Sequence, residues 1–196
     1  MPAPPDGSDP AIDRTTGGRG SGAVIGIAPV RTPLAHDLLA VGPAAVRANA
    51  SEVLALTRGG PGGRGADSTV APEDAANAAR ALAGDHRCVV AVSGASDLVT
   101  DGRRTVRITN GSPALPRVTG TGCLLGGLTA ALLATAGEEA KGVTPFASVV
   151  AATALLTVAA DRVGDLRPGS FKVALLDALD EVTADEVGRE MMLTCE

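Results

Sequence analysis

Apolar and polar residues along the chain alternate in a way that predicts short strands separated by helices. Short apolar runs predict strands at 23–27, 44–48 and 88–92. The last of these, CVVAV, is typical of a strand covered on both faces. Leu98–Thr100 and Thr105–Ile108 flank the turn residues Asp101-Gly102 and predict a hairpin. Strands that alternate with helices indicate an α/β domain with a mostly parallel sheet flanked by helices.

The helices are predicted from apolar periodicity together with start and stop signals. They are expected at 32–40, 51–56, 72–83, 122–136, 145–162 and 170–182. Residues 1–22 are rich in Pro and Gly and carry too little apolar surface to offset the entropy of ordering, so a disordered tail is expected. Residues 23–184 are expected to form one partial α/β domain, and residues 185–196 a C-terminal tail that frays from about Asp185.

Two uncharged stretches, Val118–Gly137 and Gly142–Ala160, approach the length of a membrane span. Ala, Gly, Thr and Ser dominate both, and Pro145 interrupts the second. The residues that supply most of the insertion energy are therefore sparse. Buried helices of a soluble α/β protein have the same pattern, and this interpretation, with no membrane contact, is preferred. The glycine-rich segment Arg58–Gly65 lacks a preceding strand and a Gly-Lys-Ser/Thr ending, so it is interpreted as a flexible connection.

Composition excludes several classes of partner. The net charge is −5, and no Lys/Arg block is present, which argues against nucleic-acid binding. The chain has two Phe and no Trp or Tyr, so it offers few platforms for stacking bases or sugars. The three cysteines are widely spaced and form no CxxC pair, which argues against a disulfide framework or a zinc site and favours the cytoplasm.

The segment with the clearest chemistry is Val118–Cys123, VTGTGC, directly before an apolar helix. Two glycines bracketed by threonines at a helix start can expose consecutive backbone N–H groups, which together with the helix dipole form an anion site. A tight turn with a threonine cap explains the same spacing equally well. Cys123 could be a polar group beside a transferred phosphate or a small buried hydrophobe.

Four segments in the same order resemble the hydroxyethylthiazole kinases of thiamine biosynthesis. They are RANASE (Arg47–Glu52), VAVSG with Asp97 and TDG (Val90–Gly102), NGSPALPRVTGTGC (Asn110–Cys123) and PGSF (Pro168–Phe171). The resemblance extends over roughly Pro29–Leu179. It implies a ribokinase-like fold and ATP-dependent phosphorylation of 4-methyl-5-(2-hydroxyethyl)thiazole, with Mg²⁺ as cofactor. It also implies a homo-oligomer, a trimer with sites at subunit interfaces.

The resemblance assigns a role to each matching residue. Cys123 would be the catalytic position, where other ribokinase-type enzymes place an aspartate base. Gly120 would also contact the thiazole alcohol. The anion hole would consist of Thr119, Gly120, Thr121 and Gly122.

The resemblance also implies a nucleotide and metal site. Arg47 and Ser93 would bind ATP, whereas Asn49 and Glu52 would organise Mg²⁺, Glu52 directly or through water. Because Asn49 and Glu52 are three residues apart at a strand-to-helix turn, their side chains can converge on one hydrated cation. Without the resemblance, Glu52 is better interpreted as an acid at a helix N-terminus close to the Asn49 cap.

The match breaks at the N-terminal side. The family's first βα units have no counterpart in residues 1–22, and the metal-binding aspartate of its Asp-Pro-Val-Gly segment aligns with Ser21. An N-terminally incomplete ribokinase-like fold is therefore expected, with an open sheet edge and an uncovered apolar face. The alternative function is a catalytically inactive homologue that binds a nucleotide or a partner. A pyrimidine or pyridoxal kinase is disfavoured, because those relatives usually keep an aspartate at the position of Cys123.

Overall fold

The computed structural model describes residues 31–58, 72–138 and 142–196. The helices are α1 (Arg31–Ala40), α2 (Ala50–Arg58), α3 (Pro72–His86), α4 (Thr121–Glu138), α5 (Pro145–Val163), α6 (Pro168–Glu181) and α7 (Ala184–Glu190). The strands are β1 (Ala45–Asn49), β2 (Val89–Ser93), β3 (Asp97–Thr100), β4 (Thr105–Ile108) and β5 (Leu193–Cys195). A short 3-10 helix covers Leu115–Arg117. The predicted helices and the predicted hairpin are thus present. The predicted strand at 23–27, the predicted tail at 1–22 and most of the loop at 58–65 lie outside the described residues.

The five strands form one sheet in the order β1-β2-β3-β4-β5. Among the described strands, only the β1–β2 pair is parallel, and the other three neighbouring pairs are antiparallel. The prediction of a mostly parallel sheet is therefore wrong for the described residues. The reason is connection length: only residues 94–96 link β2 to β3, and short links join antiparallel strands, whereas the parallel β1–β2 pair is connected through α2 and α3.

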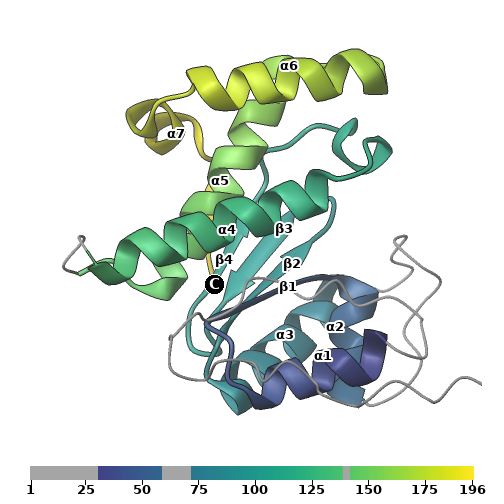
Figure 1. The fold of residues 1–196 in the computed structure, drawn as a ribbon, viewed down its shortest axis with the longest axis vertical. Helices are drawn as coiled ribbons and strands as arrows, with labels where there is room; N and C mark the ends of the chain where they lie inside the picture. The colour runs from purple at the N-terminus through teal and green to yellow at the C-terminus, as the bar shows by residue number, and fades with distance from the viewer. Residues whose placement is uncertain (1–30, 59–71, 139–141) are drawn as a thin grey trace, which may run out of the picture.

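Alternate side chains of β1 and β2 point to opposite faces of the sheet. Val46 and Val90 pack with α1, α2 and α3 on one face. Ala45 and Ala91 belong to a cluster with Val149 of α5 on the other face. Helices therefore cover the sheet on both sides, as Figure 1 shows. Since Arg47 lies two residues after Ala45 on β1, it belongs to the face that α5 covers.

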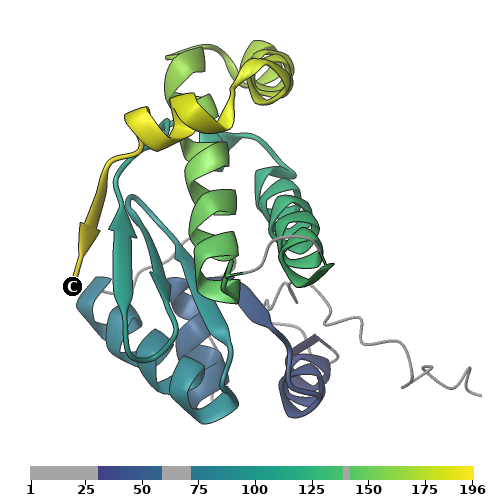
Figure 2. The ribbon, with the colours of Figure 1, turned by 90° about the vertical axis from the view of Figure 1, so that its left-hand side faces the viewer.

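A further core lies away from the sheet, where α4, α5 and α6 meet. Phe171 of α6 is fully buried there, with Leu156 of α5 and Leu125 of α4. Figure 2 shows α6 and α7 at the end of the molecule opposite α1–α3. α5 is long and apolar enough to cross a membrane by length and composition, and 61% of that stretch is buried inside the protein. It is therefore the central core helix, in agreement with the preferred interpretation of its sequence.

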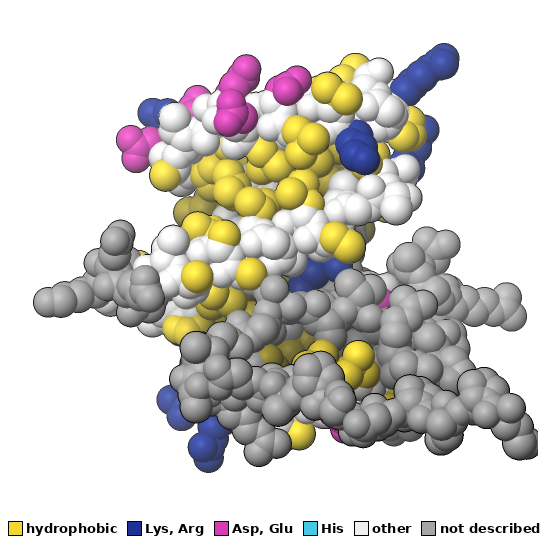
Figure 3. Space-filling view, in the orientation of Figure 1, with side chains coloured by type: hydrophobic (Ala, Val, Ile, Leu, Met, Phe, Trp, Pro, Cys, Tyr) yellow, Lys and Arg dark blue, Asp and Glu magenta, His cyan; other side chains and the backbone are white. Residues whose placement is uncertain are grey.

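α4 is as apolar as α5 but much more exposed. Between Thr121 and Thr135, only Leu125 and Thr129 are buried. Figure 3 shows hydrophobic side chains gathered between α4 and α6 on the face in view. Leu176 and Val173 of α6 are 50% and 61% exposed. Apolar side chains are therefore exposed between α4 and α6 in the described part of the chain.

The C-terminal residues are ordered, and the prediction that they fray from about Asp185 is wrong. Thr183 and Glu186 form a capping box that starts α7. β5 then pairs with β4, and the Glu196 carboxylate binds Arg80 and Arg107, each at 2.7 Å. These contacts tie the chain end to the outer edge of the sheet, where Figure 2 shows it.

Candidate active site

The loop before α4 is shaped by a glycine in the left-handed region. Gly120 has a φ of 101°, which glycine adopts readily and a residue with a side chain does not. Its carbonyl accepts the first backbone hydrogen bond of α4, from the N–H of Leu124 at 2.9 Å. The N–H groups of Thr121, Gly122 and Cys123 precede this bond and have no partner within the helix. Together with the positive end of the helix dipole, they form a place where an anion can bind.

The side chains around these donors differ in their surroundings. The Thr121 hydroxyl lies 3.2 Å from the carbonyl oxygens of both Leu115 and Val118, so it stabilises the loop from within. Thr121 can therefore contribute to an anion site through its backbone N–H rather than its hydroxyl. Thr119 is exposed. Cys123 is a free and exposed thiol, so its interpretation as a small buried hydrophobe is wrong.

Arg47 of β1 reaches the first turn of α4. A Cβ placed on Gly122 would lie 2.7 Å from Arg47 Nη1 and 3.0 Å from Cζ. The guanidinium thus occupies the space that the missing side chain leaves. Arg47 Nη2 donates a hydrogen bond to Ser93 Oγ at 3.2 Å, while Nε is buried and has no hydrogen-bond partner among the described residues. A guanidinium and a helix N-terminus are therefore in contact, which concentrates positive potential at one point.

Ser93 ends β2, and the turn that follows is closed by Asp97. Asp97 Oδ1 accepts a hydrogen bond from the backbone N–H of Gly94 at 2.9 Å. Burial of this partly exposed carboxyl raises its pKa to about 6, although the Gly94 bond and the charge of Arg47 both act to lower it.

Asn49 and Glu52 form a reciprocal cap at the start of α2. The Glu52 carboxylate accepts from the backbone N–H of Asn49 at 2.8 Å, and Asn49 Oδ1 accepts from the backbone N–H of Glu52 at 2.9 Å. Asn49 Oδ1 also accepts from Ser51 Oγ at 3.0 Å. The interpretation of Glu52 as a helix acid near the Asn49 cap is therefore confirmed. Within the described ranges, no group of three or more His, Cys, Asp or Glu side chains could hold a metal ion.

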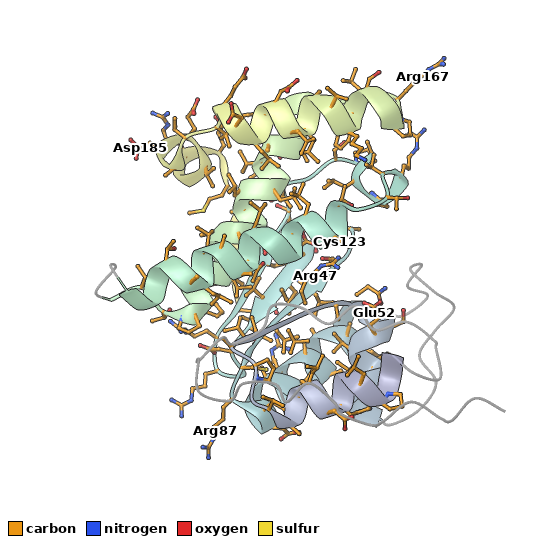
Figure 4. All side chains as sticks on the ribbon, in the orientation of Figure 1. Arg47, Glu52, Arg87, Cys123, Arg167 and Asp185 are labelled. Atoms are coloured by element: carbon orange, nitrogen blue, oxygen red, sulfur yellow. The ribbon has the colours of Figure 1, made fainter. Side chains whose placement is uncertain are left out.

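The structure brings the predicted residues together from three segments that are distant in sequence. Asn49 faces Ser93 in the β1–β2 register, and Arg47 lies two residues earlier on β1. Figure 4 shows Arg47 beside Cys123 at the start of α4, with Glu52 nearby at the start of α2. Crevices at the carboxyl ends of parallel strands are the usual ligand sites of α/β folds. This site offers N–H donors and one guanidinium, a combination that suits the oxygens of a phosphoryl group.

Comparison with known proteins agrees with this chemistry. The model of the hydroxyethylthiazole kinase family matches residues 22–185. The chain belongs to the hydroxyethylthiazole kinase family. A hydroxyethylthiazole kinase from Clavibacter sepedonicus is 48% identical over 172 residues, which are 87% of this chain and 60% of that protein. The corresponding protein from Kineococcus radiotolerans is 44% identical over 163 residues, 82% of this chain and 57% of that one. The chain thus spans about 60% of the length of these curated relatives.

Solved structures of related kinases have a similar fold. The hydroxyethylthiazole kinase protein from Pyrococcus horikoshii OT3 superimposes with a TM-score of 0.72 at 29% identity, over 87% of this chain and 62% of that one. The Staphylococcus aureus pyridoxal kinase in complex with AMP-PCP and pyridoxal gives a TM-score of 0.52 at 22% identity, over 71% and 50% of the two chains, and is similar in fold alone. The predicted family and the predicted ribokinase-like α/β fold class of this chain are therefore confirmed.

Sequence reasoning missed two features of this site. The contact between Arg47 and Gly122 joins residues from different elements, and no local pattern predicts it. The other is the turn closed by Asp97: an Asp three residues after a Gly at a strand end is a local turn signal.

Proposed function

We propose that this chain transfers the γ-phosphoryl group of ATP to the hydroxyl of 4-methyl-5-(2-hydroxyethyl)thiazole. One observation carries the proposal beyond family membership: the Arg47 guanidinium meets the first turn of α4 at Gly122, next to Cys123. Two independent positive groups thus converge where a phosphoryl group would lie. Phosphoryl transfer needs mainly positioning and electrostatic stabilisation, and this arrangement is suited to both.

In this proposal the substrate hydroxyl oxygen attacks the γ-phosphorus and forms a new P–O bond. The bond from that phosphorus to the oxygen bridging the β-phosphate breaks, ADP leaves, and the hydroxyl proton is released to solvent. The anion hole of residues 119–122 binds the phosphoryl oxygens through backbone N–H groups, which stabilises the charge developing on them. Gly120 contacts the thiazole alcohol because its left-handed backbone leaves the loop without a side chain there. Cys123 is the polar group beside the transferred phosphate.

Arg47 and Ser93 would bind the nucleotide phosphates in this scheme, since their side chains already contact one another at the end of β2. The donor set at the start of α2 fits a hydrated Mg²⁺ that is bound chiefly by phosphates and water. Glu52 would hold it directly or through water, and Asn49, which bonds to Glu52 in the reciprocal cap, would help to organise it. When bound, Mg²⁺ would neutralise negative charge on the nucleotide phosphates.

We further propose a homo-oligomer, a trimer by family resemblance, that works in the cytoplasm without contact with nucleic acid or membrane. The exposed apolar side chains of α6, Val173 and Leu176, support burial of this face against another subunit. All three cysteines are free thiols, as expected in a reducing compartment. Sedimentation analysis of the wild type and of Leu176→Glu tests the assembly. A monomeric wild type would contradict it.

The direct test incubates the purified chain with Mg²⁺, ATP and the thiazole alcohol and follows the thiazole phosphate by mass spectrometry. Product is expected with the wild type and should fall sharply with Cys123→Ala and Glu52→Ala. Asp185→Ala changes an exposed acid on α7, far from the site, and is the matched control. Absence of product, combined with thermal stabilisation by ATP, would instead support the alternative of an inactive nucleotide-binding homologue.

A further inference from the structure

A guanidinium that acts on a transferred phosphoryl group must be held in one place. The hydrogen bond that the structure shows for the Arg47 guanidinium goes to Ser93 Oγ. Its Nε is buried without a hydrogen-bond partner in the described part of the chain. Arg47 also lies against Gly122, which offers no side chain to hold it. The position of Arg47 over α4 therefore depends on where Ser93 lies.

Ser93 is the last residue of β2, and the turn of residues 94–96 follows it directly. Of the side chains at this turn, Asp97 is the one that bonds back across it, through Oδ1 to the N–H of Gly94. This bond closes a ring around the turn and restricts the backbone next to Ser93. The positive charge of Arg47 also acts to lower the pKa of this carboxyl, against the larger effect of burial.

We infer that Asp97 is a positioning residue: by holding the Gly94 N–H it fixes the β2–β3 turn, keeps Ser93 against Arg47 and so holds the guanidinium at the first turn of α4. The inference deepens the proposed function, since Arg47 is one of its phosphate-binding groups. The inference is tested without substrate. A chain that lacks kinase activity can therefore still show whether Asp97 positions Arg47.

The three cysteines provide a test that needs no ligand. Cys123 is exposed and lies beside the guanidinium, Cys195 is exposed on β5, and Cys88 is buried. The alkylation rate of each thiol is measured with iodoacetate, which is negatively charged, and with iodoacetamide, which is neutral. Both reagents react with the same thiolate and release iodide, so the ratio of the two rates reports the local electrostatic potential and not the ionisation of the thiol. Cys195 is the internal control for reagent effects, and protection of Cys88 verifies that each variant is folded.

Loss of the positive charge in Arg47→Gln should lower the iodoacetate to iodoacetamide ratio at Cys123 by about threefold, the effect of one charge at roughly 6 Å in a nearly aqueous site. Asp97→Ala should lower it by a similar factor, because the guanidinium leaves α4. Asp97→Asn keeps an oxygen acceptor for Gly94 and should leave the ratio at least at the wild-type value. The ratio at Cys195 should stay constant in all variants.

The control for a purely local role is Ser93→Ala, which removes the acceptor of the Arg47 hydrogen bond. In the Ser93→Ala background, Asp97→Ala should cause little further fall in the ratio at Cys123, because both changes break the same series of contacts from Asp97 through Ser93 to Arg47. A ratio at Cys123 that rises or stays unchanged in Asp97→Ala would overturn the inference, since Asp97 would then contribute only its negative charge. An equal fall in Asp97→Asn and Asp97→Ala would overturn it as well.

Discussion

Gly122→Ala tests the contact on which the candidate site depends, because it separates function from stability. The added methyl group would lie 2.7 Å from Arg47 Nη1 and 3.0 Å from Nη2. Ordinary contacts between such atoms are about 3.5 Å or longer, so the guanidinium must move by roughly 0.8 Å or more. The side chain can do so at small cost, since the atoms involved are the far end of a flexible arginine.

Gly122→Ala should leave stability unchanged or raise it slightly, and it should lower activity. Alanine is favoured over glycine within a helix by about 0.5–1 kcal/mol, so the free energy of unfolding should be unchanged or slightly higher. A catalytic group displaced by about 1 Å can cost on the order of a hundredfold in rate. We therefore expect kcat/KM for ATP to fall by roughly tenfold to a hundredfold in a protein that is at least as stable as the wild type.

The assay measures thiazole phosphate formation against ATP concentration, together with urea unfolding of the same preparations. Gly127→Ala is the matched control: it lies in the same helix, and a Cβ there meets no atom within 4 Å. It should show the gain in stability without the loss in activity. In an Arg47→Ala background, Gly122→Ala should have no further effect on activity.

Two results would refute this reasoning. Full activity of Gly122→Ala would mean that the position of Arg47 does not matter to the reaction. An equal loss in Gly127→Ala would mean that the rigidity of α4, rather than the contact with Arg47, controls the rate.

Three further variants test the local structure. Gly120→Ala should destabilise the chain by about 1 kcal/mol in urea unfolding, because a φ of 101° strains any side-chain residue although the space is open. Asp97→Asn should raise Tm relative to the wild type at pH 8 and much less at pH 4: the folded pKa of about 6 lies above the ordinary value of 3.8, so ionisation costs stability that grows as the pH rises from about 4 to 6, and protonation removes that cost. Partial exposure should limit this gain to about 1 kcal/mol. Thr183→Ala should cost about 1 kcal/mol through loss of the α7 capping box, whereas Thr183→Ser should not.

Local sequence signals were sufficient for most elements of this fold. Apolar periodicity and the Thr and Pro residues at helix starts placed α1, α4, α5 and α6 to within a few residues. The Asp-Gly pair placed the β3–β4 hairpin. The capping box at Thr183 and Glu186 is a local signal of the same kind, and it marks the start of α7. β5 could not be predicted in this way, because its order comes from pairing with β4 and from the ion pairs of Glu196.

Family motifs located the site residues, but their contacts are properties of the fold. RANASE and VTGTGC carry no signal that Arg47 lies against Gly122, since that contact results from the β1 register and from the packing of α4 over one face of the sheet. The motifs also leave open what Glu52 does. The structure shows that its carboxylate already accepts a hydrogen bond from the backbone N–H of Asn49 at the start of α2. A metal bound by Glu52 would therefore share this carboxylate with the helix cap.

The site contains polar groups whose bonding capacity the fold leaves unused. Arg47 Nε is buried without a hydrogen-bond partner among the described residues, and the guanidinium lies against the N–H groups that begin α4, where like partial charges oppose one another. A buried unsatisfied donor costs about 1–3 kcal/mol. Such an arrangement is poor for stability alone, and Gly122 makes it worse by giving up helix propensity to leave room for the guanidinium. A bound anion would relieve the opposition between these positive groups, which is why residues that weaken the isolated fold are the ones expected to bind the phosphoryl group.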